Sequence, residues 1–551
     1  MRRHLIATAF AVLLGTAGFA SAQDGQIVIF NNNAPGVGFN DPTPAAPVGG
    51  NPGTTLGQQR ANVFLHAAAI WEAKLHPKND IDVVAQFTPL GPNVLGSAGA
   101  IQVWRDFDGA ELPGTWYPVA LANQLAGEDL SQCGTPLVIT CFDIVANFAT
   151  TFNFYMGLDN NEGPGQQDLL AVILHELGHG LGVANFVNET MGTLLADIPD
   201  VYSQYTLDVS TNRTWNQMTI PERIASAVNI RRVSWSGLHV NAAVPIVLRP
   251  GEPAVLVTSG PMVQTLALGD ASFGAPLTPS GITGEVVLAL DAADAAGPST
   301  TDGCSPIANN IAGKIALMDR GTCGFVVKVK NAQNAGALAA LIGDNVVSLP
   351  PAGLGGVDPT ITITSGRISL PDANAIKAGL PGVTVRMLLD DSILAGTDRV
   401  QGLMMLAAFN PVISGSLISH FESIASPNQL MEPAINSDLT SSVDTPRDLT
   451  TKLLTDIGWF SDRDGVPDGT DRCLASDIKA TVVIGTCDSG VTNDVQADGC
   501  SVSDVIARCS TAGNRGQYAS CVARATAALQ TAGVISDADH DKIQSCAAVR
   551  K

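Results

Sequence analysis

The sequence predicts an α+β fold made of a mixed, twisted sheet with two helices, a β-rich insertion and a small disulfide-rich tail. Before residue 185, short apolar runs typical of strands alternate with two long segments of helical periodicity. Between residues 243 and 396, short Val, Ile and Leu runs alternate with Gly-Pro turns, a texture typical of β-rich modules. Six of the ten cysteines follow residue 472, which predicts a C-terminal tail stabilised by disulfides.

The first residues have the layout of a secretory signal peptide. A basic start is followed by an apolar run from Leu5 to about Ala20 and by the small-residue site Ala20-Ser21-Ala22. That run is too short for a comfortable membrane anchor and ends in a cleavable site. We therefore expect residues 1–22 to be removed and the protein to be secreted, with no membrane span in the mature chain.

The overall charge argues against nucleic-acid partners. The chain has 51 acidic and 30 basic residues, for a net charge of −21. Phosphate backbones require clustered Lys and Arg, and no such cluster occurs in the sequence. The acidity is typical of a soluble exported protein.

The main domain is predicted from five elements. Apolar runs predict strands at residues 26–31, 81–87 and 143–148. Helical periodicity predicts helices at residues 58–75 and 167–181, the second stopped by Gly182. We assign residues 23–242 to the first part of this domain and residues 397–460 to its second part, with the insertion at 243–396 between them.

The second predicted helix carries the motif His175-Glu176-Leu177-Gly178-His179. Residues i and i+4 lie on one face of a helix, so both imidazoles can reach one ion. Zinc binds neutral imidazole nitrogens and leaves a position for water in catalytic sites. Glu176 is placed to accept that water's proton as general base. A coincidental surface pair is the alternative, but a chain with only 8 histidines rarely forms this pattern by chance.

The third zinc ligand is not obvious from the motif. Gly182 follows at the spacing of the HExxHxxGxxH signature, but Asn185 occupies the position of the last histidine. Asn is a weak zinc ligand, so either the site is damaged or the ligand comes from elsewhere. Among the remaining histidines, His66, His76, His239 and His540 lack a supporting pattern, which leaves His420 in Ser419-His420-Phe421-Glu422 as the candidate.

The motifs together resemble the leishmanolysin-type branch of the metzincin zinc peptidases. The resemblance covers roughly residues 55–185 and 400–460 and is carried by HELGHGLG, SHFE and NQLMEP. It implies a metzincin-like catalytic domain, His420 as third ligand and Met431 as the methionine beneath the metal. An ordinary buried methionine is the alternative for Met431. No cysteine lies between residue 22 and Cys133, so no pro-segment thiol is available there to cap the zinc.

The insertion resembles a protease-associated (PA) domain. The resemblance rests on Asp302-Gly303-Cys304, on the turn Asp319-Arg320-Gly321-Thr322-Cys323 and on an Ala-rich helix predicted at residues 327–340. We expect disulfides within two local cysteine groups, Cys304 with Cys323 and Cys133 with Cys141. Two roles are open for such a module: it binds substrate or restricts the cleft, or it is a tolerated spacer.

An acidic stretch at residues 461–475 precedes the tail. Asp462, Asp464, Asp468 and Asp471 are interleaved with glycines and resemble one thrombospondin type 3 repeat, which implies a calcium site. A solvated acidic linker is the alternative. The Cys-rich tail at 476–551 has helical patterns at 502–507 and 518–529, and its six cysteines, Cys473 included, allow 15 pairings.

The function predicted from these features is that of a secreted, zinc-dependent endopeptidase acting on extracellular proteins or peptides. Two alternatives stay open. One is an inactive, zinc-containing adhesion or binding protein, which the intact Glu176 disfavours because a structural site needs no base. The other is an exopeptidase, because PA modules also occur in aminopeptidases.

Overall fold

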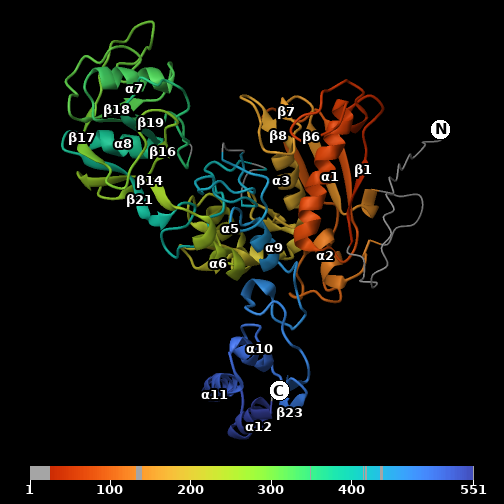
Figure 1. Cartoon of the computed structure of the whole chain (residues 1–551). Coiled ribbons are helices and arrows are strands. Elements are labelled where there is room, and N and C mark those ends of the chain that lie inside the picture. Colours follow the sequence, from red (N-terminus) through yellow and green to blue (C-terminus); the bar gives the residue numbers. More distant parts are fainter. Residues whose placement is uncertain are drawn as a thin grey trace.

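The chain folds into a main domain, an inserted domain and a tail (Figure 1). This computed structural model describes residues 25–131, 139–347, 349–413, 415, 418–434 and 438–549. The predicted signal peptide at 1–22 and the predicted disulfide partner Cys133 lie outside the described residues. Within those residues, no helix has the length and apolar character needed to cross a membrane.

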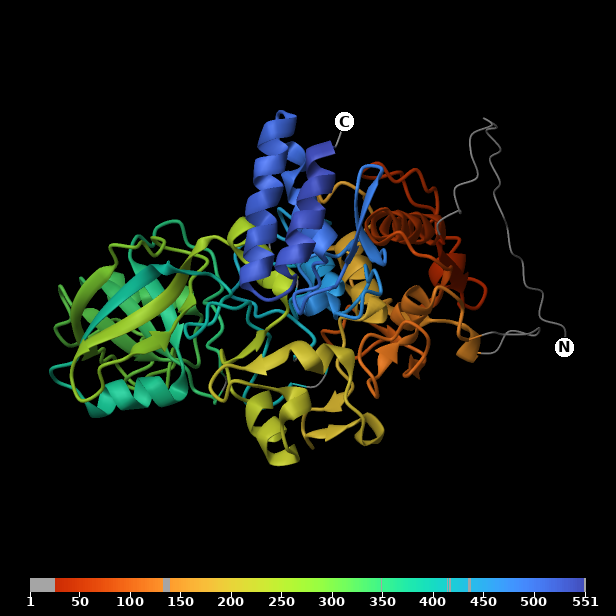
Figure 2. The ribbon, with the colours of Figure 1, turned by 90° about the horizontal axis from the view of Figure 1, so that it is seen from below.

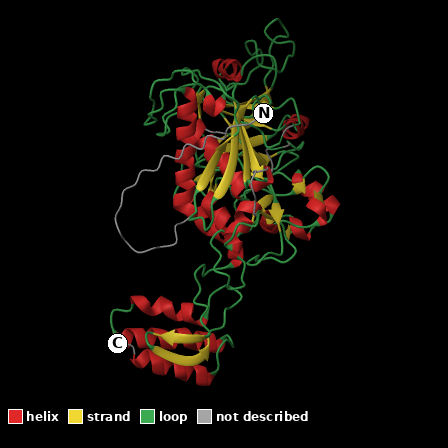
Figure 3. Ribbon diagram, turned by 90° about the vertical axis from the view of Figure 1, so that its right-hand side faces the viewer, coloured by secondary structure: helices red, strands yellow, loops and turns green. Residues whose placement is uncertain are grey.

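A four-stranded sheet with the order β1-β2-β6-β3 forms the centre of the main domain. β1 (Ile27–Asn31), β2 (Ile81–Thr88) and β6 (Ile144–Ala149) are parallel, as expected for the three predicted strands, and β3 (Gly96–Ala100) runs antiparallel to β6 at the edge. Figure 3 shows these strands side by side, with helices beside them. The antiparallel strand β3 was not predicted from the sequence.

Two long helices pack together beside this sheet. α1 (Leu56–Leu75) begins after Thr55, whose side chain accepts a hydrogen bond from the backbone N–H of Gln58. α3 (Leu169–Leu181) begins after Asp168, whose carboxylate accepts a hydrogen bond from the N–H of Leu170. Both helices fall within two residues of the predicted ranges because each has a clear cap and a continuous apolar face.

Smaller elements complete the main domain. The short strands are β4 (Val103–Trp104), β5 (Tyr117–Pro118), β7 (Phe154–Tyr155), β8 (Gln167–Asp168), β9 (Val187–Asn188), β10 (Thr193–Leu194), β11 (Thr206–Asp208), β12 (Arg213–Thr214) and β13 (Val233–Trp235). The additional helices are α2 (Val119–Ala126), α4 (Val201–Tyr205), α5 (Ile220–Ala227), α6 (Leu238–Val247) and α9 (Thr450–Asp456). One apolar core contains side chains from both sides of the insertion, including Trp235, Phe421 and Trp459.

The inserted domain is an eight-stranded sheet with the order β15-β14-β21-β17-β18-β19-β20-β16. Its strands are β14 (Pro250–Ser259), β15 (Thr265–Ala267), β16 (Gly269–Asp270), β17 (Ile282–Leu288), β18 (Ile315–Asp319), β19 (Ala339–Gly343), β20 (Thr364–Ile368) and β21 (Thr384–Leu394). The chain enters through β14 and leaves through β21, which are paired antiparallel with Pro250 opposite Leu394. The domain has apolar cores of its own.

Two details of the insertion differ from the sequence prediction. The predicted start at residue 243 is too early, because α6 continues to Val247 and buries Val244 and Val247 in the core of the main domain. The predicted helix at 327–340 is also wrong at its end. α7 covers Phe325–Asn334, and residues 339–340 begin the fully buried strand β19, since an all-apolar run fits a central parallel strand as well as a helix. A second helix, α8, covers Leu370–Ala378.

The expected disulfide of the insertion is present. Cys304 and Cys323 are joined with an S–S distance of 2.08 Å and close a loop between β17 and α7. A loop of about this length contributes roughly 3 kcal/mol through the unfolded state if the bridge is unstrained.

The tail is a separate small unit that projects from the main domain (Figure 2). It contains β22 (Thr481–Ile484), β23 (Cys487–Thr492), α10 (Val502–Ala507), α11 (Arg515–Thr531) and α12 (Asp537–Val549). Its disulfides are Cys473–Cys500, Cys487–Cys546 and Cys509–Cys521. These bridges surround an apolar core that the tail does not share with the main domain.

Candidate metal centre and cleft

Three histidines from two distant segments converge beside the sheet. The Nε2 atom of His179 lies 3.1 Å from that of His175 and 3.2 Å from that of His420. Three nitrogens bound to one tetrahedral zinc ion at 2.0–2.1 Å would lie about 3.3 Å apart. The three side chains are therefore spaced as a zinc site requires, with residue 420 arriving from beyond the insertion.

Backbone carbonyls fix the orientation of the first two imidazoles. The Nδ1 atom of His175 lies 2.7 Å from the carbonyl oxygen of Leu430, and that of His179 lies 2.7 Å from the carbonyl of Val183. A proton on each Nδ1 donated to these oxygens leaves each Nε2 free to bind a cation. Burial lowers the pKa of His175 to about 3 and also lowers the pKa of His179, so both rings are held in the neutral form that binds metal.

Glu176 lies in the same site, next to the edge strand β3. Its side chain is 7% exposed and accepts a hydrogen bond from the backbone of Ala98. Burial raises the pKa of this carboxyl to about 8 in the metal-free chain. Gly96 makes this approach possible, because a Cβ at position 96 would lie 2.8 Å from the Cγ of Glu176.

Met431 lies beneath the helix that carries the first two histidines. It is fully buried, and a Cβ added at Gly178 would lie 2.8 Å from its Sδ atom. The glycine within the motif thus allows the methionine to pack directly against α3. The resemblance implies that Met431 lies beneath the metal, and that role stays a prediction.

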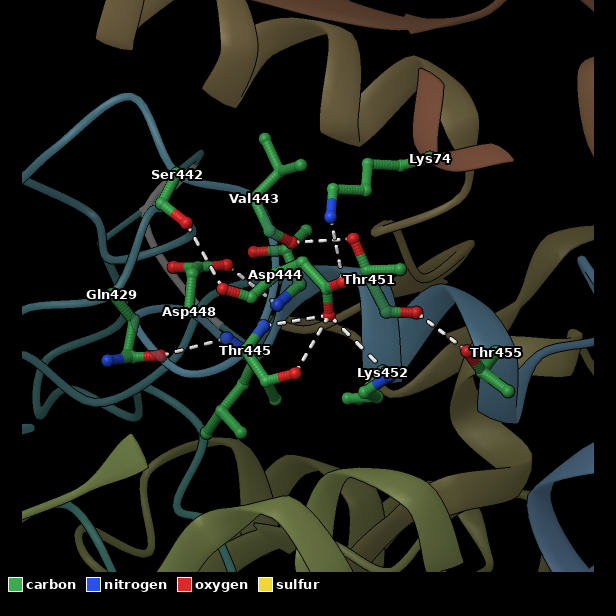
Figure 4. A network of polar contacts seen from close by, with 12 residues as sticks. Lys74, Gln429, Ser442, Val443, Asp444, Thr445, Asp448, Thr451, Lys452 and Thr455 are labelled. Atoms are coloured by element: carbon green, nitrogen blue, oxygen red, sulfur yellow. Dashed lines mark hydrogen bonds and ion pairs between the residues drawn. The ribbon is translucent and has the colours of Figure 1, made fainter. Parts of the chain in front are cut away.

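A polar network holds the segment that contains Met431 (Figure 4). The carboxylate of Asp448 accepts a hydrogen bond of 2.6 Å from the N–H of Leu430, and Gln429 accepts one of 3.0 Å from the N–H of Leu449. Asp444 adds ion pairs to Lys74 on α1 and Lys452 on α9. The carbonyl that orients His175 is therefore fixed by contacts on both sides.

Gly182 and Asn185 shape the turn after α3. Gly182 ends the helix with a φ of +134°, and a Cβ there would lie 2.7 Å from Ile457. Asn185 donates its backbone N–H to the hydroxyl of Ser419, at 3.0 Å. The position that carries a histidine in the HExxHxxGxxH signature thus contacts the residue beside His420, and the three imidazoles meet without it.

A cleft of about 500 Å³ surrounds the three histidines and Glu176. Its lining includes residues 93–98, which contain the start of β3, and also Ala184, Asn185, Glu189, Gly415, Ser419 and His420. The sequence analysis missed Gly96, Ala98 and Glu189. For Gly96, the only signal available was a glycine-rich run, Gly96-Ser97-Ala98-Gly99-Ala100, which has little strand propensity.

The structure separates the four aspartates of the predicted calcium site. Ligand atoms of Asp462, Asp464 and Asp471 lie within 4.8 Å of one another. Asp468 instead faces the main domain, where its N–H donates to Glu111 at 3.2 Å. Burial, together with the neighbouring Glu111, raises the pKa of Asp468 well above its usual range. Asp468 is therefore not part of the group whose ligand atoms lie that close together.

Within the described residues, no other histidine belongs to the cluster of three. His239 lies on α6, where its Nε2 is 3.0 Å from the carbonyl oxygen of Asp468 and its N–H donates to Asp456. His66 lies on α1, and His540 lies on α12 in the tail. His239 is thus a buried neighbour of the acidic stretch and serves as a natural control for the metal centre.

Comparisons with known proteins concern mainly the insertion. The family profile of the PA domain matches residues 282–376, which confirms the predicted PA insertion. That segment contains none of the residues that line the cleft.

Similar proteins include several named as peptidases. "Signal peptide peptidase-like 3" from Arabidopsis thaliana is 31% identical over 160 residues, which cover 28% of this chain and 29% of that protein. "Probable lipoprotein aminopeptidase LpqL" from Mycobacterium tuberculosis is 33% identical over 176 residues, covering 31% of this chain and 33% of that one. A solved zinc aminopeptidase from Bacillus subtilis, BSAP, is 21% identical, with a TM-score of 0.20, and the match covers 34% of this chain and 42% of that one.

These matches limit what the comparisons say about the whole chain. The chain spans about a third of the length of the two curated relatives described here. Their names connect it with peptidases, and they do not support the more specific resemblance to leishmanolysin-type metzincins. That resemblance stays a prediction carried by the motifs around His175 and His420.

Proposed function

We propose that the protein is a zinc-dependent peptidase whose metal is held by His175, His179 and His420, with Glu176 as general base. The observation that carries the proposal is the convergence of three imidazole Nε2 atoms, at zinc-site spacing, beside a buried carboxylate. The motifs and the position of Met431 further support a metzincin-like catalytic domain. The disulfides are compatible with the oxidising surroundings of a secreted protein.

The residues of the site have distinct tasks in peptide hydrolysis. A bound zinc ion would polarise the scissile carbonyl and make an attacking water more acidic. Glu176 takes a proton from that water and passes it to the nitrogen of the leaving amine. The hydrogen bond from the backbone of Ala98 holds the Glu176 carboxylate in place for this exchange.

The edge strand supports cleavage within a chain. Among the residues that the structure describes, β3 pairs in the sheet with β6 alone, and Gly96, Ser97 and Ala98 line the cleft. An extended peptide can add to such an edge through main-chain hydrogen bonds, largely independent of its side chains. A substrate bound this way would run past Glu176, so we propose internal peptide bonds as the target.

Removal of N-terminal residues is the second candidate function. The relatives named as aminopeptidases favour this exopeptidase alternative over an endopeptidase. The cleft also contains a carboxylate, Glu189, that could hold a free α-ammonium group. An enzyme of this kind would need that amino group, whereas an enzyme that uses only the strand edge would not.

Internal cleavage and removal of N-terminal residues can be distinguished with two peptides of identical sequence, one with a free N-terminus and one with an acetylated N-terminus. We expect the protein to cut unfolded casein and to cut both peptides internally, as followed by mass spectrometry. Cleavage of the free peptide alone, one residue at a time, would establish the exopeptidase. A zinc chelator should stop all cleavage and added zinc should restore it, so activity that survives chelation would end the zinc proposal.

We also propose a calcium ion at Asp462, Asp464 and Asp471. Asp471 is completely buried, and its Oδ2 atom and that of Asp464 have no hydrogen-bond partner among the described residues. Buried carboxylate oxygens without partners are costly unless a cation is present. Glycines at 465 and 469 give the loop the freedom that calcium loops need.

Calcium at a hundred times its dissociation constant is expected to stabilise the folded protein by about 2.7 kcal/mol, which raises the melting temperature. Asp471→Asn should remove this response because it weakens one of three carboxylate ligands. Asp468→Asn is the matched control and should keep the response, since Asp468 faces Glu111. Equal responses of the two variants in a thermal melt would argue against the site.

A further inference from the structure

The charges lining the cleft are all of one sign. Its charged side chains are the carboxylates Glu176, Glu189 and Glu432, and no Lys or Arg is among the lining residues. The three histidines are the only other titratable groups there, and burial favours the neutral form of His175 and His179. A zinc ion bound to the histidines would add two positive charges, so whether a carboxylate meets a cation of the substrate depends on that carboxylate's own surroundings.

The positions of two of the three carboxylates are explained without a bound substrate. Glu176 lies beside the histidines and accepts a hydrogen bond from Ala98, as expected of the general base. Glu432 accepts a hydrogen bond of 2.8 Å from the N–H of Gln429 and so helps to hold the turn that contains Met431. Neither carboxylate needs a substrate group to explain its position.

Glu189 differs from both. It follows the turn after α3, and the hydrogen bond that its side chain makes is a long one of 3.4 Å from the amide of Asn185. No ion pair joins it to a cation within the described part of the chain. Burial raises the pKa of this carboxyl. A cation beside it would lower that pKa and offset the cost of burying the charge.

The position of Glu189 places it next to a peptide bound in the cleft. Ala184, Asn185 and Glu189 form one part of the cleft wall, and Gly96–Ala98 on β3 form another part, beside Glu176. Asn185 ties this wall to Ser419 and thereby to the segment of His420. Glu189 is thus connected through Asn185 to the segment that carries His420. This connection holds its carboxylate in a defined position relative to the metal centre, as a selective contact requires.

We infer that Glu189 binds a cationic group of the substrate, an ammonium or a guanidinium, and makes the peptidase selective for peptides that carry one near the scissile bond. This inference rests on the proposed peptidase function. The cation has two sources: a Lys or Arg side chain, which suits internal cleavage, or the free amino terminus, which suits an exopeptidase. The chemistry recognised by Glu189 is the same in both cases.

The test uses four peptides of one sequence that vary independently in the two sources of charge. They carry either Lys or the uncharged norleucine next to the scissile bond, each with a free or an acetylated N-terminus. We expect kcat/KM to be higher for peptides with the cation that Glu189 binds. Glu189→Gln should reduce kcat/KM for these peptides by about 10- to 100-fold, as expected for loss of a charge-assisted hydrogen bond, and should leave the uncharged peptide unchanged.

The matched control is Glu128→Gln, at an exposed glutamate outside the cleft, which should alter neither value. Glu189→Lys should reverse the selectivity and favour peptides with Asp at the varied position. If the wild-type protein cuts all four peptides equally, or if Glu189→Gln lowers all four rates alike, the inference is wrong while the peptidase proposal stands. If no peptide is cut by zinc-loaded protein, both are overturned.

Discussion

Glu176→Gln is expected to lower kcat by about 10²- to 10⁴-fold while zinc remains bound at one ion per chain. The imidazoles of His175 and His179 do not depend on Glu176 for their orientation, because the backbone carbonyls of Leu430 and Val183 hold them. Loss of the carboxylate removes only the acceptor for the proton of the attacking water, which typically contributes an effect of this size. The measurements are peptide turnover and metal analysis of the same purified sample.

Glu162→Gln, at an exposed glutamate, provides the control for this variant and should retain wild-type turnover. Undiminished turnover in Glu176→Gln would remove Glu176 from the mechanism. Zinc retained at full occupancy in a wild-type protein that cuts no peptide would instead favour the inactive binding protein over the enzyme.

His420→Ala is expected to weaken zinc binding by about a hundredfold or more and to abolish turnover. Structural zinc sites contribute apparent binding free energies of about 10–16 kcal/mol, so one ligand accounts for roughly 3 kcal/mol, and each 1.4 kcal/mol is a factor of ten. Without His420, two ligands from one helical turn remain, and the segment that returns from beyond the insertion no longer reaches the ion. Zinc occupancy during competition with a chelator measures the change.

His239→Ala is the matched control, because His239 is a partly buried histidine of the same domain that contacts Asp468 rather than the cluster. It should retain wild-type zinc affinity. If His239→Ala lost zinc and His420→Ala kept it, the ligand assignment would have to be exchanged between them.

Local patterns predicted the helices and parallel strands of the main domain, and distant contacts explain what they missed. α1 and α3 have caps and apolar faces that are visible within their own residues. β3 has neither, since Gly96-Ser97-Ala98-Gly99-Ala100 becomes a strand only by pairing with β6, and its small residues make room for Glu176. The end of the insertion's first helix was missed because Ala339 and Ala340 suit a helix as well as the buried strand that they enter.

In the candidate site, too, local patterns predicted some residues and missed those whose positions depend on distant contacts. The spacing of His175 and His179 follows from the geometry of one helix, and His420 could be proposed by elimination and by resemblance. The role of Glu189 could not be inferred, because nothing near it in the sequence indicates that it lines a cleft. Asp468 was predicted together with its neighbours in the chain, and its contact with Glu111, 357 residues away, could not be predicted from that pattern.

His179, the second histidine of α3, is separated from His420 by 241 positions along the chain, and this distance has a consequence during biosynthesis. At translation rates of about 5–20 residues per second, the third imidazole is made roughly 10–50 s after the second. During that interval, the nascent chain contains only two of the three proposed zinc ligands, His175 and His179. The proposed zinc binding, and with it the proposed peptidase activity, would therefore begin only after the insertion and the segment that carries His420 have been made.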